Sequence, residues 1–93
     1  MTDWWQKREI DRKLTRELHV SQEAYRMATI KVRDMIAEVE AGILVADGNL
    51  ALQQAYRART DAFAVWKTAL GRWTDFVKSG AIPEDLKSDG AAS

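Results

Sequence analysis

Apolar positions repeat with the period of an α-helix in two long stretches of the chain. In the first stretch, steps of four and three connect Leu14, Leu18, Ser21, Tyr25, Ala28, Val32, Met35 and Val39. In the second, they connect Leu52, Tyr56, Arg59, Phe63, Trp66, Leu70, Trp73 and Val77, with Ala55, Ala62 and Ala69 beside them at intervals of seven. This heptad-like pattern predicts two amphipathic helices that approach closely along the alanine edge.

The strongest turn signal in the chain, the sequence DGN at residues 47–49, lies between the two stretches. Gly48 suits the left-handed position that ends one helix, and Asn49 can cap the next. A turn centred there makes the two stretches antiparallel and pairs positions whose numbers sum to about 96. Val32 is therefore expected near Ala64.

Helix ends follow from the capping and breaking residues. Ser21 can cap a helix, with Val20 and Tyr25 spaced to form a hydrophobic staple across it. Gly80 and the single proline, Pro83, stop the last helix. The predicted helices are residues 3–18, 21–45 and 49–79. One uninterrupted helix over the first two ranges is the alternative.

These elements predict an all-α fold, an antiparallel helical hairpin with an extra N-terminal helix that completes a three-helix bundle. The domain covers residues 1–80, and residues 81–93 form a mobile polar tail. A helix over 49–79 is about 46 Å long, and a hairpin of two helices cannot bury a helix of this length on all sides. A third helix or a second copy is needed, so a homodimer is also expected.

Composition narrows the function classes. The chain has 14 basic and 14 acidic residues and a formal net charge of zero, which argues against a dedicated nucleic-acid binder. It has no cysteine, which excludes disulfides and thiolate metal sites and favours the cytoplasm. The longest apolar run, ILVA at residues 43–46, is far shorter than a bilayer span. We expect no transmembrane segment and no cleaved signal.

Motifs for catalysis or for binding a metal or cofactor are missing. The glycine positions fit neither a dinucleotide fingerprint nor a phosphate loop, and His19 is the only histidine. Asp34 and Glu38 share a helix face, but the Glu-x-x-His pairs of helical metal sites are absent. Arg59 occupies an apolar position of the stripe and is expected to pair with Glu38 or Glu40, or to lie at an edge.

Short stretches of the chain resemble two known helical families. Residues 8–18, REIDRKLTREL, resemble the first helix of all-helical chorismate mutases, and the size and central turn resemble small secreted Trp-X-Gly hairpins. The mutases need several inward arginines and a lysine around a dianionic substrate, and the later helices here have no matching pattern. The turn reads ADGN instead of Trp-X-Gly. Neither resemblance extends to these features, and no enzymatic activity is expected.

Two adjacent tryptophans stand at the start of the chain, and neighbouring side chains on a helix point about 100° apart. Trp4 is expected to close one edge of the apolar stripe, whereas Trp5 is expected among arginines on the opposite side. The alternative is a helix that begins after Trp5, with both rings folded onto the bundle. The predicted partner-binding residues are Trp5, Arg8, Arg12 and Arg16.

The sequence therefore predicts a small, non-enzymatic protein–protein interaction module, an adaptor, regulator or inhibitor that acts by surface contact, without a cofactor. The alternative is a nucleic-acid-associated factor that uses basic faces of the first and last helices. Five cations against two acids give the range 49–79 a net charge of +3: Arg57, Arg59, Lys67, Arg72 and Lys78 against Asp61 and Asp75.

Overall fold

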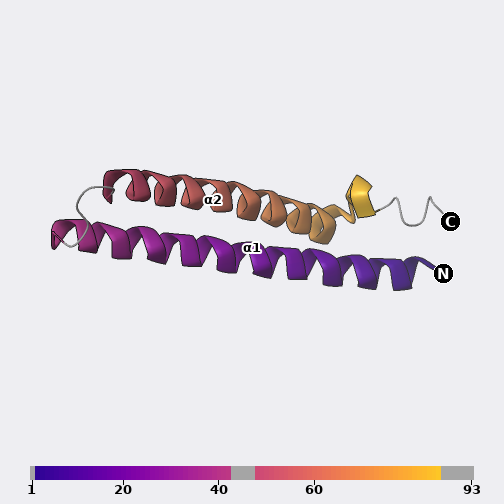
Figure 1. Ribbon diagram of the computed structural model, residues 1–93. Coiled ribbons are helices and arrows are strands. Elements are labelled where there is room, and N and C mark those ends of the chain that lie inside the picture. The colour runs from indigo at the N-terminus through magenta and orange to yellow at the C-terminus, as the bar shows by residue number, and fades with distance from the viewer. Residues whose placement is uncertain (1, 43–47, 87–93) are drawn as a thin grey trace.

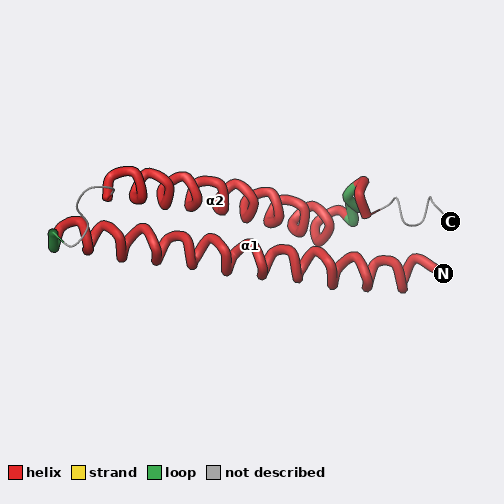
Figure 2. The backbone as a smooth tube through the Cα atoms, in the orientation of Figure 1, coloured by secondary structure: helices red, strands yellow, loops and turns green. Residues whose placement is uncertain are grey.

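The computed structural model describes residues 2–42 and 48–86 of an elongated helical hairpin, 63 × 22 × 16 Å in its principal extents. Two long helices, α1 (Thr2–Glu40) and α2 (Gly48–Ser79), run side by side in opposite directions (Figure 1). The backbone trace shows no strand in these ranges (Figure 2). The predicted all-α antiparallel hairpin is confirmed.

The first helix is continuous, so the expected break between residues 18 and 21 is absent and the alternative of one helix is found. Ser21 does not cap a helix, because its hydroxyl donates a hydrogen bond to the carbonyl oxygen of Leu18 at 3.0 Å. This local bond satisfies the hydroxyl inside the helix, where Ser21 is only 4% exposed. Val20 is exposed and does not staple the chain to Tyr25.

The C-terminal end of α2 matches its predicted glycine stop, whereas the C-terminal end of α1 does not. Gly80 has a φ of 73° and donates a hydrogen bond to the carbonyl oxygen of Phe76 at 2.9 Å, as in a left-handed helix cap. The left-handed glycine after α1 is Gly42, with a φ of 74°, whereas Gly48 begins α2. Helix α1 consequently ends five residues before the predicted residue 45.

The core lies along a seam between the helices. Every member of the stripe predicted in the first stretch is buried or half-buried. On α2 the seam is rotated toward the alanine edge, where Ala55 and Ala69 are buried. The α2 seam consists of Leu52, Ala55, Arg59, Ala62, Trp66, Ala69, Trp73 and Phe76. Small alanines let the large side chains of α1 approach the α2 backbone.

The pairing of the two helices differs from the expected alignment. Contacts between Glu17 and Arg72, and from Tyr25 to Phe63 and Trp66, join positions whose numbers sum to 89, 88 and 91. The predicted sum of about 96 is therefore wrong by about seven residues, which is one heptad. The reason is that the left-handed glycine after α1 is Gly42, six residues before the predicted turn at Gly48. Residues 2–9 therefore extend beyond the end of α2 (Figure 1).

Residues 80–86 do not separate from the hairpin as the predicted tail from residue 81 would. A short helical turn follows Pro83, closed by a hydrogen bond from the Leu86 amide to the Pro83 carbonyl oxygen at 3.0 Å. Ile82, Pro83 and Leu86 are half-buried. Residues 87–93 of that predicted tail lie outside the described ranges. Neither long helix combines the length and the apolar character that crossing a bilayer requires.

Candidate functional site

The predicted partner-binding residues form an exposed surface on the outer side of α1, which we call the N-terminal surface: Trp5, Arg8, Arg12 and Arg16. Steps of three and four residues place them on one face of the helix. Trp5 is 69% exposed. A shallow groove of about 470 Å³ follows the same face and is lined by Arg8, Asp11, Arg12, Thr15, Arg16, His19 and Val20.

The two tryptophans form an edge-to-face pair, with ring centroids 4.9 Å apart and planes at 80°. Trp4 is 56% exposed, so the expectation that it closes the core stripe is wrong. Helix α2 ends before it reaches Trp4, and no side chain of α2 is available to cover the ring. The alternative, in which both rings fold onto the bundle, fails as well because α1 begins at Thr2.

The guanidinium groups of the N-terminal surface are only weakly engaged within the chain. Arg8 lies over the ring of Trp4, with Cζ 5.3 Å from its centroid, and not over Trp5. Arg12 lies 3.8 Å from Glu9, and both side chains are exposed, so this pair contributes little. For Arg8 and Arg16 no ion pair is found within residues 2–42 and 48–86. Their donors are free to meet an anionic group.

A second candidate region is an aromatic cluster on one side of the hairpin. Tyr25 of α1 is stacked on Trp66 of α2, with centroids 5.9 Å apart and planes at 6°, and lies 5.3 Å from Phe63. The cluster borders a recess of about 420 Å³ lined by Tyr25, Arg59, Thr60 and Phe63. The heptad pattern identified Phe63 and Trp66 as packing residues but did not predict that Phe63 stays 41% exposed.

Arg59 lies at the edge of this cluster instead of pairing with Glu38 or Glu40. Its Cζ lies 5.1 Å from the centroid of the Tyr56 ring. The observed alignment of the helices places Arg59 more than one turn away from both carboxylates. Arg59 is half-buried, and no ion pair of its side chain is found in the described part of the chain.

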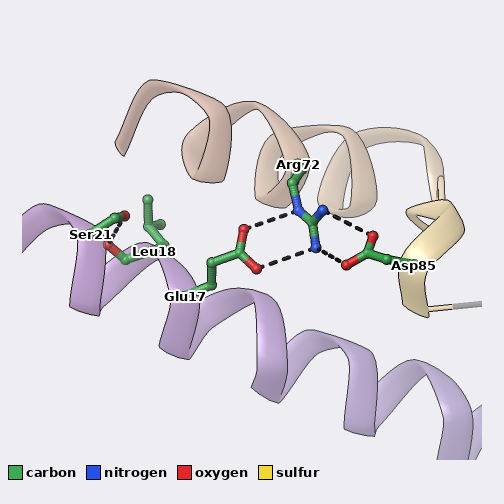
Figure 3. Close-up of polar contacts among 5 residues, drawn as sticks. All are labelled: Glu17, Leu18, Ser21, Arg72 and Asp85. Carbon is green, nitrogen blue, oxygen red and sulfur yellow. Dashed lines mark hydrogen bonds and ion pairs between the residues drawn. The ribbon is translucent and has the colours of Figure 1, made fainter. Parts of the chain in front are cut away.

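Polar contacts between the helices gather around Arg72 (Figure 3). Its Nη1 and Nη2 each lie 3.0 Å from an oxygen of Asp85, and Nη2 lies 3.3 Å from Oε2 of Glu17. The buried Nε lies 3.0 Å from Oε1 of Glu17, close enough for an ion pair but without hydrogen-bond alignment. Arg72 therefore connects α1, α2 and the segment after Gly80.

The hydrogen bonds from Arg72 stabilise the ionised carboxylate of Asp85 and hold its pKa below the ordinary value. The same bonds raise the pKa of Arg72, which stays charged. A depressed pKa in the folded state means that the contact stabilises the fold above the unfolded pKa of Asp, about 3.9. This contribution is lost as the pH falls through the folded pKa.

Asp85→Asn is therefore expected to make the melting temperature less sensitive to acid. Above about pH 5 the variant should melt slightly below the wild type, and the difference should shrink as the pH falls below about 4. Thermal melts followed by circular dichroism from neutral to acidic pH measure this. Asp61→Asn is the control, because it removes an exposed carboxylate of α2 for which no ion pair is found in residues 2–42 and 48–86. A constant difference at all pH values would contradict the assignment.

The described residues contain no group of three or more His, Cys, Asp or Glu side chains that could hold a metal ion. Comparison of the chain with protein-family models, curated proteins and solved structures finds no match. The N-terminal surface and the aromatic cluster are the two candidate regions of the described residues.

Proposed function

We propose that the chain is a non-enzymatic protein–protein interaction module, an adaptor, regulator or inhibitor that binds its partner by surface contact. The observation that supports this function best is the N-terminal surface, where an exposed Trp5 and Arg8 on the projecting end of α1 are followed along the same face by Arg12 and Arg16. Tryptophan and arginine are the residues most enriched at the energetic centres of protein interfaces.

The chemistry of this surface suits a partner that carries both carboxylates and an apolar patch. Arg8, Arg12 and Arg16 recur at intervals of four, so their charges follow the helix axis at intervals of about 6 Å. A helical partner with acidic residues at the same interval would match that spacing. The indole of Trp5 would pack against apolar atoms beside them, which adds contact area that a purely ionic surface lacks.

A nucleic-acid partner is the second candidate, favoured by the unpaired arginines of this surface and by the net positive charge of α2. Glu9 and Asp11 lie among those arginines and would face phosphates unfavourably. Titration of labelled duplex DNA and single-stranded RNA at increasing salt tests this candidate. Binding that weakens steeply with salt would support it, whereas absence of binding at low salt would remove it.

Trp5→Ala is expected to separate binding from stability. The ring is exposed, so the free energy of unfolding should change by no more than about 0.5 kcal/mol. Affinity for a protein captured on the wild-type chain from its native lysate should fall by about 2 kcal/mol or more, as at a tryptophan hot spot. Chemical denaturation and titration calorimetry measure the two quantities.

The matched control for this experiment is Val65→Ala, which removes an exposed apolar side chain from α2 far from the N-terminal surface. It should leave both stability and affinity near the wild-type values. Unchanged affinity in Trp5→Ala would remove the N-terminal surface as the binding site. A loss of stability equal to the loss of affinity would show that the ring supports the fold instead.

A further inference from the structure

The apolar seam continues past the end of α2, where the last described residues take the place of the helix. Ile10 is only 7% exposed, although the alignment of the helices places it about opposite Ser79, the last residue of α2. Ser79 is itself exposed and is too small to cover an isoleucine. Beyond it, the segment that contains the half-buried Ile82, Pro83 and Leu86 lies on the same side of α1 as α2 (Figure 1). Three apolar side chains are therefore available there to cover Ile10.

An ion pair with Arg72 fastens this segment, residues 81–86, to the hairpin (Figure 3). Two nitrogens of Arg72 each lie 3.0 Å from an oxygen of Asp85, in the two-point geometry that guanidinium and carboxylate groups favour. The half-buried guanidinium also contacts Glu17 of α1, which holds it in place. Asp85 is exposed, so water can replace its side of the contact. Arg72 is thus a fixed part of the hairpin, whereas Asp85 belongs to a segment that can leave it.

The connection between α2 and this segment permits such a movement. Gly80 has a φ of 73°, the left-handed conformation at which a helix ends and the chain changes direction. The amide of Ala81 donates a long hydrogen bond, 3.4 Å, to the carbonyl oxygen of Asp75. The bond from the Leu86 amide to the Pro83 carbonyl oxygen lies within the segment and does not depend on the hairpin. A segment with few buried apolar side chains opens at a lower free energy than the helices of a core.

We propose that residues 81–86 are a strap that opens at Gly80 while the hairpin stays folded, and that Arg72 is the catch that keeps the strap closed. Opening uncovers Ile10 on the first turns of α1. Ile10 and Arg12 point about 160° apart on the helix, so the uncovered side lies opposite the N-terminal surface. The strap therefore controls whether this end of α1 offers a partner one binding side or two. That control of binding rests on the proposed function, whereas the opening of the strap does not.

Thiol labelling of the full chain measures the opening, because the chain has no cysteine of its own. Ile82→Cys and Leu86→Cys place a thiol at half-buried positions of the strap, and Ala81→Cys places one at an exposed position beside them. With a maleimide at low concentration, the two half-buried thiols should react about tenfold more slowly than Ala81→Cys. Equal rates at all three positions would overturn the proposal, because the strap would then not be closed. Circular dichroism checks that each variant keeps the helices.

The catch is tested by a double-mutant cycle in the Ile82→Cys chain. Asp85→Asn and Arg72→Gln should each speed the labelling by about fivefold or more, because either change removes the two-point ion pair. Adding Asp85→Asn to Arg72→Gln should change the rate little further, since the two residues act through one contact. Asp61→Asn, which removes an exposed carboxylate elsewhere on α2, should leave the rate unchanged. An effect of Asp85→Asn that persists in full beside Arg72→Gln would exclude Arg72 as the catch.

Ser21→Cys distinguishes opening of the strap from unfolding of the hairpin, because Ser21 lies in the seam and is only 4% exposed. Val32→Ala weakens the seam far from the strap, since Val32 is 1% exposed. It should speed the labelling of Ser21→Cys by about tenfold or more and leave that of Ile82→Cys unchanged. Equal acceleration at both positions would show that the segment opens only when the whole hairpin unfolds, and the strap would be refuted. None of these rates involves the N-terminal surface, so that result would leave the proposed function standing.

Discussion

Replacement of Leu14 with alanine is expected to lower the free energy of unfolding by about 3 kcal/mol, within the range of 2–5 kcal/mol seen for buried leucines. Leu14 is 0% exposed and is one of the two largest side chains that the hairpin buries completely. The substitution removes apolar contacts and leaves a cavity that two straight helices cannot easily close. Urea unfolding followed by helical circular dichroism measures the loss.

The loss is large relative to the total stability of a chain this small. Domains of about this size have a free energy of unfolding near 5 kcal/mol at the lower end, so Leu14→Ala should leave about 2 kcal/mol and an unfolded fraction of a few per cent. Val20→Ala is the control, because Val20 lies six residues further along α1 and is 62% exposed. It should change stability by no more than about 0.5 kcal/mol. Equal effects of the two substitutions would contradict the assignment of the seam.

Ala69→Leu is expected to destabilise the hairpin by about 1–3 kcal/mol, although leucine is more apolar than alanine. Ala69 is 1% exposed and lies about opposite Ser21, where the two helices meet through small side chains. A larger side chain there must push the helices apart or adopt a strained rotamer. The melting temperature and the urea midpoint should both fall.

Ala64→Leu provides the comparison, since Ala64 is exposed on the same helix. Alanine and leucine both have high helix propensity, so this substitution should leave the free energy of unfolding nearly unchanged. A rise in stability from Ala69→Leu would mean that the close approach of the helices at Ala69 is not a packing constraint.

The sequence was sufficient to predict the class of fold and much of the seam because helical periodicity is a local property. The stripe from Leu14 to Val39 is buried or half-buried throughout, and the alanine edge of α2 faces α1. Periodicity does not distinguish a residue on the seam from its neighbour one step around the helix. For that reason Phe63 and Val77, which belong to the predicted stripe, are exposed in the hairpin.

The N-terminal surface could be predicted from one helix, because residues three and four apart share a face whatever the rest of the fold. The exposure of Trp4 could not be predicted in this way, since it depends on where the second helix ends. The contact between Arg72 and Asp85 could not be predicted from helical periodicity either, because Asp85 follows the helix stop at Gly80 and belongs to a segment predicted as a tail. The exposure of Trp4 and the Arg72–Asp85 contact both depend on how segments far apart in the sequence are aligned in the fold.

The ion pair between Glu17 and Arg72 favours the observed alignment over one slipped by a heptad. Because both apolar stripes repeat every seven residues, a slip of one heptad, about 10 Å along the axis, would again bring apolar side chains opposite one another. The charges do not repeat in this way, since the slip would place Arg72 opposite Ala24 and Glu17 opposite Ser79. The slipped hairpin would also extend the projecting end of α1 from residues 2–9 to residues 2–16. The Glu17–Arg72 ion pair therefore acts together with the position of the connection after Gly42 to keep that free end short.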